Sequence, residues 1–148
     1  MQPNAICHNP ALQPMQMANM IRARTTIYVE GACAVDDTGN RSAGSGMWYT
    51  QGDERNVSLK HPTDLASNKL GELLAVLWAI NNEPPQNDLR IKTRSTYTVN
   101  TVLELTKQWE KTGYIGAKNE EVTRAIVAAL RGRGGPTHFI WLADRSEK

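Results

Sequence analysis

Short runs of β-branched and aromatic residues mark the first half of the chain. The run 25–29 is Thr-Thr-Ile-Tyr-Val, a composition that predicts a strand. A turn at 37–40 leads into a second predicted strand at 43–50. Gly52 and Asp53 turn the chain again, and 56–60 can form a third strand. Three strands joined by short turns predict an antiparallel meander.

The hydrophobic period then changes from two to about 3.6. One predicted helix carries its apolar residues on a single face, with the spacing i, i+3, i+4, i+7, i+8: Leu70, Leu73, Leu74, Leu77 and Trp78. Ser67 or Asn68 can cap its start, and the Pro84-Pro85 pair prevents its continuation. The hydrophobic pattern therefore predicts a helix that packs one face on a sheet.

Strands and helices alternate in the rest of the chain. The pattern predicts a strand at 89–93, helices at 96–105 and 119–131, and a final strand at 137–142. The order βββαβααβ indicates a mixed α/β fold with helices packed on the sheet. Residues 1–24 show no sustained period, so we expect an irregular arm with a short helical turn near 15–20, followed by one domain over 25–148.

Composition and charge narrow the class of protein. A chain of 148 residues with 40% hydrophobic residues can form one domain with a real core. The net charge of +2 is too small to indicate nucleic-acid binding, although a local basic face remains open. The longest apolar stretch, 70–80, is too short to cross a bilayer, and the N-terminus lacks a secretory pattern. We expect a soluble intracellular protein with no membrane partner, and reduced thiols at Cys7 and Cys33.

Several segments resemble landmarks of the ribonuclease H family and follow the family's order. The run 27–33 resembles its opening strand, which ends there in Asp-Gly-Ser/Ala-Cys, and 67–73 resembles its Asn-x-x-x-Glu-Leu at the first helix. The segment 92–97 resembles its Thr-Asp-Ser-x-Tyr segment. Further matches lie at 41–49, 109–114 and 139–141, so the resemblance covers about residues 25–143.

The resemblance implies a ribonuclease H-like mixed five-stranded sheet with the first and fourth strands at its centre. It also implies a nucleic-acid groove and a cluster of acidic side chains that holds two Mg²⁺ ions. Such ions lie about 4 Å apart, activate a water and stabilise the leaving oxygen of a phosphodiester. Hard cations this close together need several anionic oxygen ligands.

The matching positions of this chain do not provide the full set of carboxylates. Glu30 stands where the family has its first Asp, and Glu72 is retained on the first helix. Arg94 stands where the family has its next Asp, and arginine stays protonated at ordinary pH. We therefore expect Arg94 to pair with Glu30 and Glu72 and to fill the metal site. No cofactor is expected, and Mg²⁺ would bind, through Glu30 and Glu72, only if the chain were an active enzyme.

The end of the chain also departs from the family pattern. After the strand containing Trp141 the family has a Lys-Gly-His loop and a helix that carries its last acidic ligand. Residues 142–148 match neither, so we expect the C-terminal helix to be absent, with Asp144 as a conceivable substitute carboxylate. Solvent-facing positions remain the alternative for Glu30, Glu72 and Arg94.

Other residues are candidates for nucleic-acid contact. Lys107, Trp109 and Lys111 interleave basic and aromatic side chains, which suits a duplex grip but equally suits helix-loop packing. Arg131 and Arg133 lie beside Gly132 and Gly134 and could form a flexible basic tip that touches phosphate. Three further tryptophans are assigned to the core: Trp48, Trp78 and Trp141.

Three functions remain open. The leading hypothesis is a ribonuclease H-like domain that has lost metal-dependent hydrolysis and binds RNA–DNA hybrid or double-stranded RNA, with Arg94 contacting phosphate. The second is a protein-interaction or self-association module, such as a homodimer, that uses the surface left by the missing helix. The third is a divergent Mg²⁺-dependent hybrid endoribonuclease that uses Glu30, Glu72 and Asp144.

Overall fold

The sheet and its helices follow the predicted order of elements. The computed structural model describes residues 5–8, 23–108 and 120–142. Its strands are β1 (Ala5–His8), β2 (Arg24–Val35), β3 (Arg41–Trp48), β4 (Val57–Pro62), β5 (Asp88–Thr93) and β6 (Thr137–Trp141). Its helices are α2 (Asn68–Asn82), α3 (Thr96–Gln108) and α4 (Glu120–Arg131).

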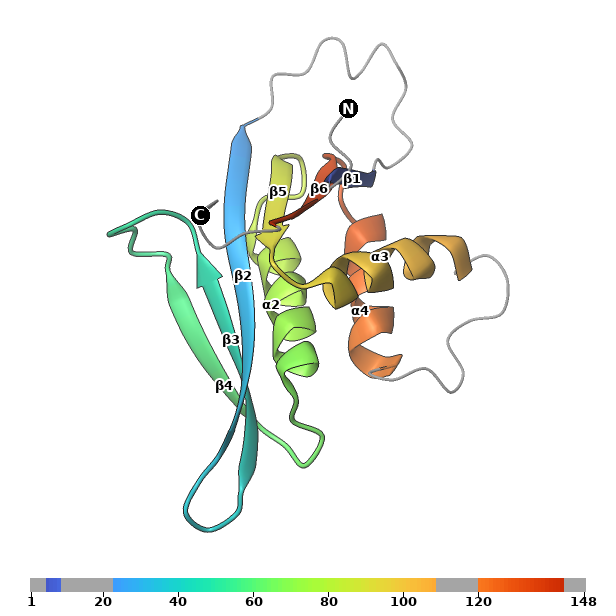
Figure 1. Ribbon diagram of the computed structural model, residues 1–148. Helices are drawn as coiled ribbons and strands as arrows, with labels where there is room; N and C mark the ends of the chain where they lie inside the picture. The colour runs from blue at the N-terminus through green and yellow to red at the C-terminus, as the bar shows by residue number, and fades with distance from the viewer. Residues whose placement is uncertain (1–4, 9–22, 109–119, 143–148) are drawn as a thin grey trace, which may run out of the picture.

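The six strands form one mixed sheet in the order β1-β6-β5-β2-β3-β4. Strands β2, β3 and β4 pair antiparallel, which confirms the predicted meander. Strand β5 pairs parallel with both β2 and β6. The two strands expected at the centre, β2 and β5, are therefore adjacent in the middle of the sheet, and the three helices lie to one side of it (Figure 1).

The expectation of an irregular N-terminal arm is wrong for Ala5–His8. These residues form β1 and pair antiparallel with β6, with Ile6 opposite Phe139. A strand of four residues is too short to show a period in the sequence, and its pairing depends on an edge that comes from the far end of the chain. The helical turn expected near 15–20 lies outside the described residues.

Helix α2 starts and ends where the sequence predicts. The Ser67 side chain caps its N-terminus by accepting a hydrogen bond from the Leu70 N–H at 3.0 Å. The helix ends at Asn82, with Glu83 as C-cap directly before the two prolines. None of the helices within the described ranges is long and apolar enough to cross a membrane.

Two glycines let α2 lie directly against the sheet backbone. A Cβ on Gly71 would overlap the Gly44 carbonyl oxygen of β3. A Cβ on Gly31 would overlap the Asn68 carbonyl oxygen and the Glu72 backbone nitrogen. Backbone can approach backbone this closely only without side chains between them. This contact places Glu72 against strand β2.

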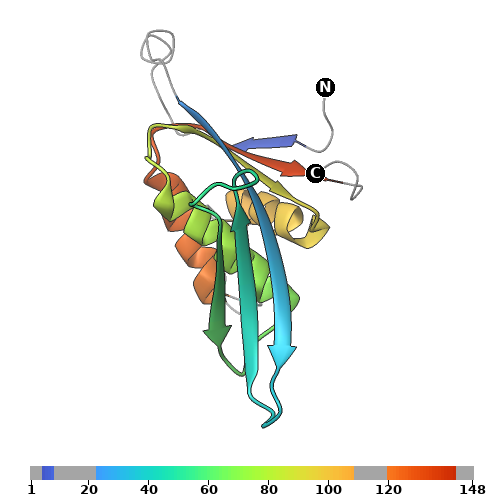
Figure 2. The same cartoon turned by 90° about the vertical axis from the view of Figure 1, so that its left-hand side faces the viewer.

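Side chains along the central strands alternate between two environments. The inward positions face the helices and are fully buried, among them Ile27, Ile91 and Phe139. The alternate positions project from the opposite face. Figure 2 views the molecule from this side, with β2, β3 and β4 in front of the helices. Trp48 lies here and is 50% exposed, so its assignment to the core is wrong. Trp78 and Trp141 are partly buried.

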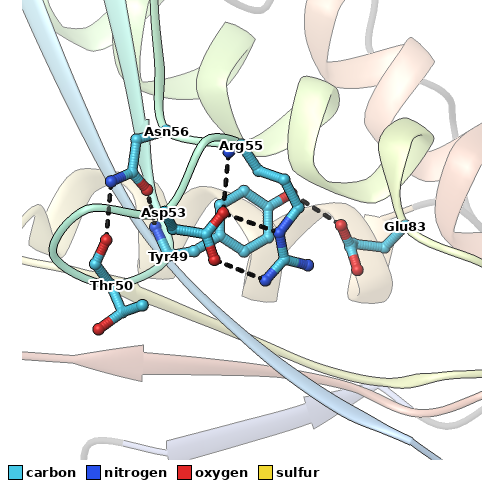
Figure 3. A network of polar contacts seen from close by, with 6 residues as sticks. All are labelled: Tyr49, Thr50, Asp53, Arg55, Asn56 and Glu83. Atoms are coloured by element: carbon cyan, nitrogen blue, oxygen red, sulfur yellow. Dashed lines mark hydrogen bonds and ion pairs between the residues drawn. The ribbon is translucent and has the colours of Figure 1, made fainter.

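A polar network fixes the β3–β4 turn to the end of α2 (Figure 3). The buried Tyr49 hydroxyl donates to Glu83 Oε2 at 2.7 Å, and the Arg55 guanidinium lies 4.0 Å from the centre of the Tyr49 ring. Asn56 Oδ1 accepts from the Tyr49 N–H at 2.7 Å, and Asp53 pairs with Arg55 at 2.9 Å. Burial, followed by the hydrogen bond to Glu83, raises the pKa of Tyr49. The turn is therefore held in place by its own polar contacts.

Candidate functional site

The fold brings Glu30, Glu72 and Arg94 together where β5 ends beside the middle of β2. Glu30 projects from β2, Glu72 lies on α2, and Arg94 directly follows β5. Arg94 Nη1 lies 3.9 Å from Glu30 Oε1. Glu30 is also close enough to Glu72 for its charge to raise the pKa of that carboxyl. The three positions singled out by the resemblance therefore share one site.

Glu72 is a buried carboxyl, with only 7% of the residue exposed. Its side chain accepts hydrogen bonds from the Thr93 hydroxyl and from the Gly31 N–H. Burial raises its pKa to about 7, helped by the charge of Glu30 and opposed by the two hydrogen bonds. Near neutral pH both the neutral and the ionised form of the Glu72 side chain are therefore populated.

Thr93 is a site residue that the sequence reasoning did not single out. It is 1% exposed, and its hydroxyl accepts from the Ser95 N–H at 3.0 Å while donating to Glu72. A signal was available, because Thr93 continues the inward positions of an otherwise apolar strand whose other inward residues are Leu89 and Ile91. A hydroxyl at such a position needs a polar partner inside the fold.

Arg94 is fixed by its backbone and partly exposed at its side chain, which is 28% accessible. The Trp141 indole N–H donates to the Arg94 carbonyl oxygen at 3.2 Å, and the Leu142 N–H donates to the Thr93 carbonyl at 2.7 Å. The end of β6 therefore holds the chain around Arg94.

The expected pairing of Arg94 is confirmed for Glu30 and wrong for Glu72. The described residues contain no ion pair within 4.0 Å between Arg94 and Glu72. Alternation along the strand explains the difference. Thr93 faces inward and reaches Glu72, whereas Arg94, the next residue, emerges on the side where Glu30 projects.

These residues do not fit a pair of Mg²⁺ ions. Within the described ranges, no three His, Cys, Asp or Glu side chains gather where they could hold a metal ion. Glu72 is partly protonated, and the only ion-paired neighbour of Glu30 described here is a guanidinium. A guanidinium at about 4 Å from a metal ion would repel it by several kcal/mol. Within the part of the chain that the structure describes, the site therefore has fewer anionic ligands than two hard cations need.

Most of the other candidate residues lie outside the described part of the chain or at an exposed helix end. Asp144, Trp109 and Lys111 lie outside the described residues, and Lys107 lies on α3 with a side chain that is not described. Arg131 is exposed at the end of α4. Glu30 is 67% exposed, yet it projects from an inner strand of the sheet and not from an edge.

The prediction that Arg133 forms part of a flexible basic tip is wrong. Arg133 is 3% exposed, and its guanidinium donates to Thr137 Oγ1 at 2.9 Å and to the Pro84 and Asn87 carbonyls. Burial lowers the pKa of its side chain. Arg133 therefore points inward and joins β6 to the loop before β5.

Comparison with known proteins agrees with this fold. A family model described as RNase H matches residues 22–141. Ribonuclease H of Schizosaccharomyces pombe is 24% identical over 99 residues, which cover 67% of this chain and 37% of that protein. Ribonuclease H1 of Homo sapiens is 28% identical over 98 residues, covering 65% of this chain and 34% of that protein. The matched region therefore spans about a third of the length of these relatives.

A solved structure shows the same architecture. It is the crystal structure of LC9-RNase H1, described as a type 1 RNase H with the type 2 active-site motif. The similarity has a TM-score of 0.56 and 17% sequence identity, and it covers 86% of this chain and 66% of that one. The family model spans most of the chain, from the start of β2 to the end of β6. This chain therefore belongs to the RNase H family.

Proposed function

We propose that this chain is an RNase H domain that has lost metal-dependent hydrolysis and binds an RNA-containing duplex, either RNA–DNA hybrid or double-stranded RNA. The observation that carries the proposal is the Arg94–Glu30 ion pair at the position of a family carboxylate. Because the chain matches about a third of the length of its relatives, their activity is not transferred to it.

Loss of hydrolysis follows from the charges at the site. Two-metal chemistry needs convergent carboxylates that balance the charge of both ions. Here one position carries a permanent positive charge, and Glu72 has a pKa of about 7. The site therefore carries much less negative charge than the mechanism requires.

The same charges favour contact with a phosphate backbone. A partly exposed guanidinium can donate two parallel hydrogen bonds to one phosphate. Partial protonation of Glu72 reduces the repulsion that an intact acidic cluster would exert on the strand. Lys92, which lines the same cavity as Arg94, adds a second positive charge nearby.

Fluorescence anisotropy with labelled hybrid, double-stranded RNA and double-stranded DNA tests the binding. We expect the RNA-containing duplexes to bind with an affinity that falls steeply between about 50 and 200 mM salt. Arg94→Gln should weaken binding and reduce the salt slope by about one. Arg124→Gln, on the exposed face of α4, is the matched control. Absence of binding at the lowest salt, or an Arg94→Gln variant that binds like the wild type, contradicts the proposal.

A cleavage assay tests the loss of hydrolysis. We expect no cleavage of the hybrid in Mg²⁺ or Mn²⁺ by the wild type. Arg94→Asp should gain affinity for Mn²⁺, seen as a metal-dependent rise in melting temperature that Arg94→Gln does not show. Cleavage by the wild type that Glu72→Ala abolishes would instead establish a divergent endoribonuclease.

A further inference from the structure

The sheet face that points away from the helices carries a row of residues on four neighbouring strands. Ile140 of β6 pairs with Lys92 of β5, Lys92 pairs with Tyr28 of β2, and Tyr28 pairs with Trp48 of β3. Paired residues in a sheet project to the same side. The three described helices pack on the opposite face of the sheet. Figure 2 shows this arrangement, with β2, β3 and β4 in front of the helices. Two aromatic rings and one ammonium group are therefore neighbours on this face.

Neighbouring residues hold the Tyr28 ring and the backbone next to Trp48. The Lys92 ammonium lies 5.3 Å from the centre of the Tyr28 ring and donates to its hydroxyl at 3.5 Å. Trp48 is half exposed and directly precedes Tyr49, whose N–H and hydroxyl are fixed by Asn56 and Glu83 (Figure 3). The indole is thus an exposed ring on a fixed backbone.

A cavity of about 540 Å³ opens beside the two rings. Its lining includes Tyr28, Trp48, Ser58, Lys92 and Arg94. Gly46 lies among them and has no side chain to fill the space. The cavity is within the range of ~300–1,000 Å³ that is typical of small-ligand sites. It is large enough for a flat heterocyclic ring.

The charge of this face is positive. On the outward positions of β2, β4 and β5 and at Arg94, five basic side chains accompany two acidic ones, and Asp36 and Asp64 lie near Lys60 at the far end of the face. The basic residues are Arg24, Lys60, Arg90, Lys92 and Arg94, and the acidic residues are Glu30 and Asp88. Asp88 is engaged within the face, 3.7 Å from both Arg24 Nε and Arg90 Nε. The excess positive charge favours an anionic partner over a neutral peptide.

We propose that this face binds single-stranded nucleic acid. An unpaired base stacks on Trp48 or Tyr28 and enters the cavity over Gly46, while Lys92 and Lys60 contact the phosphates on either side. Exposed aromatics combined with basic side chains on an open sheet suit unpaired bases, because a base within a duplex must first be unstacked and unpaired, at a cost of a few kcal/mol, before it can enter a cavity. This binding goes beyond the proposed duplex binding and does not require it, although both use Lys92 and the cavity that Arg94 lines.

Anisotropy with labelled oligonucleotides of about 10 nucleotides tests the proposal. Single-stranded RNA and single-stranded DNA of the same sequence are measured separately, because the proposed stacking and phosphate contacts suit either one. Trp48→Ala should weaken binding at least about fivefold, as expected for the loss of one stacked base. Leu65→Ala removes another exposed apolar side chain, away from this face, and should bind like the wild type.

A second variant fills the cavity without removing a ring. A Cβ on Gly46 would have Glu30 Cβ as its nearest neighbour, at 3.9 Å, so the strand tolerates a side chain there. Gly46→Val should therefore keep its melting temperature and lose most oligonucleotide affinity. Gly44→Ala is the matched control, because Gly44 lies on the same strand and outside the cavity lining, and its Cβ would meet Ala32 Cβ at an ordinary 3.6 Å.

The outcomes separate this proposal from the duplex proposal. Single-strand binding that is weakened by both Trp48→Ala and Gly46→Val supports it, whatever the duplex result. Absence of single-strand binding at about 50 mM salt overturns it, as does binding that neither variant changes. A concentration-dependent dimer in sedimentation that Trp48→Ala dissociates, without oligonucleotide binding, also overturns it and identifies the face as a contact between two copies.

Discussion

Thr93 donates its hydroxyl proton to the Glu72 carboxyl and so joins the end of β5 to the sheet-facing side of α2. Together with the Gly31 N–H it gives this carboxyl two hydrogen-bond donors. Hydrogen bonds to the ionised form lower a carboxyl pKa, yet burial outweighs them and the pKa rises to about 7. The site therefore favours a protonated Glu72 more than water does.

Stability should consequently fall as the pH rises through the weakly acidic range. The folded state holds the Glu72 proton up to a pKa of about 7, whereas the unfolded chain releases it near 4.5. Between these values the folded state binds more protons, so the free energy of unfolding decreases with pH. Glu72→Gln keeps an oxygen for Thr93 and removes this effect. Its stability advantage over the wild type should grow by about 2–3 kcal/mol from about pH 5 to pH 8.

Urea unfolding of both proteins at several pH values measures this difference. Glu54→Gln, at an exposed carboxylate in the β3–β4 turn, is the matched control and should track the wild type at every pH. A constant gap between Glu72→Gln and the wild type across the range would show that the Glu72 pKa is not raised.

Replacing Gly71 by alanine should destabilise the fold, although it lies in a helix. In an exposed helix interior this change adds about 0.5–1 kcal/mol of stability. Here the new Cβ would overlap the Gly44 carbonyl oxygen and push α2 off the sheet. We expect a loss of about 1–3 kcal/mol or more in urea unfolding. Gly44→Ala should be nearly neutral, and a stabilised Gly71→Ala variant would contradict the close packing.

Much of this fold could be predicted from local patterns. The apolar residues of α2 recur with a clear helical period between a serine cap and two prolines, so both ends of the helix could be predicted from the sequence. The family segments placed Glu30, Glu72 and Arg94 in one site, because the middle of β2, the end of β5 and the face of α2 meet there. These features depend on neighbours in sequence or on a known order of elements.

The features that were missed depend on side-chain direction and on distant partners. Because side chains alternate along the strand, Arg94 pairs with Glu30 whereas Thr93 hydrogen-bonds Glu72. A linear motif does not specify which of the two residues contacts which carboxyl. Trp48 looks like a core residue until the sheet face that carries it is known. Arg133 looks like part of an exposed glycine-rich loop, but its partners come from the loop before β5, about 46–49 positions away.

Arg133 should therefore matter for stability and not for nucleic-acid contact. Arg133→Ala removes hydrogen bonds to Thr137 Oγ1 and to the Pro84 and Asn87 carbonyls. The buried Thr137 hydroxyl and two partly buried carbonyls left without these donors make the loss on the order of 3 kcal/mol. Arg131→Ala, two residues earlier and exposed, should change stability by less than about 0.5 kcal/mol. Equal effects of the two variants in thermal unfolding would contradict this division.

The Tyr49–Glu83 hydrogen bond should show an energetic coupling that a double-mutant cycle can measure. Both residues are buried, and the bond of 2.7 Å ties the β3–β4 turn to the end of α2. Tyr49→Phe leaves the Glu83 carboxylate without this donor and should cost about 1–3 kcal/mol. Glu83→Gln keeps an acceptor for the hydroxyl and should cost less. In the double variant residue 83 carries a neutral amide, so removing the Tyr49 hydroxyl leaves no buried carboxylate without its donor. The destabilisation of the double variant should therefore be smaller than the sum of the two single effects. If urea unfolding gives additive effects within about 0.5 kcal/mol, the two side chains act independently and the turn is held by Asn56 and Arg55 instead.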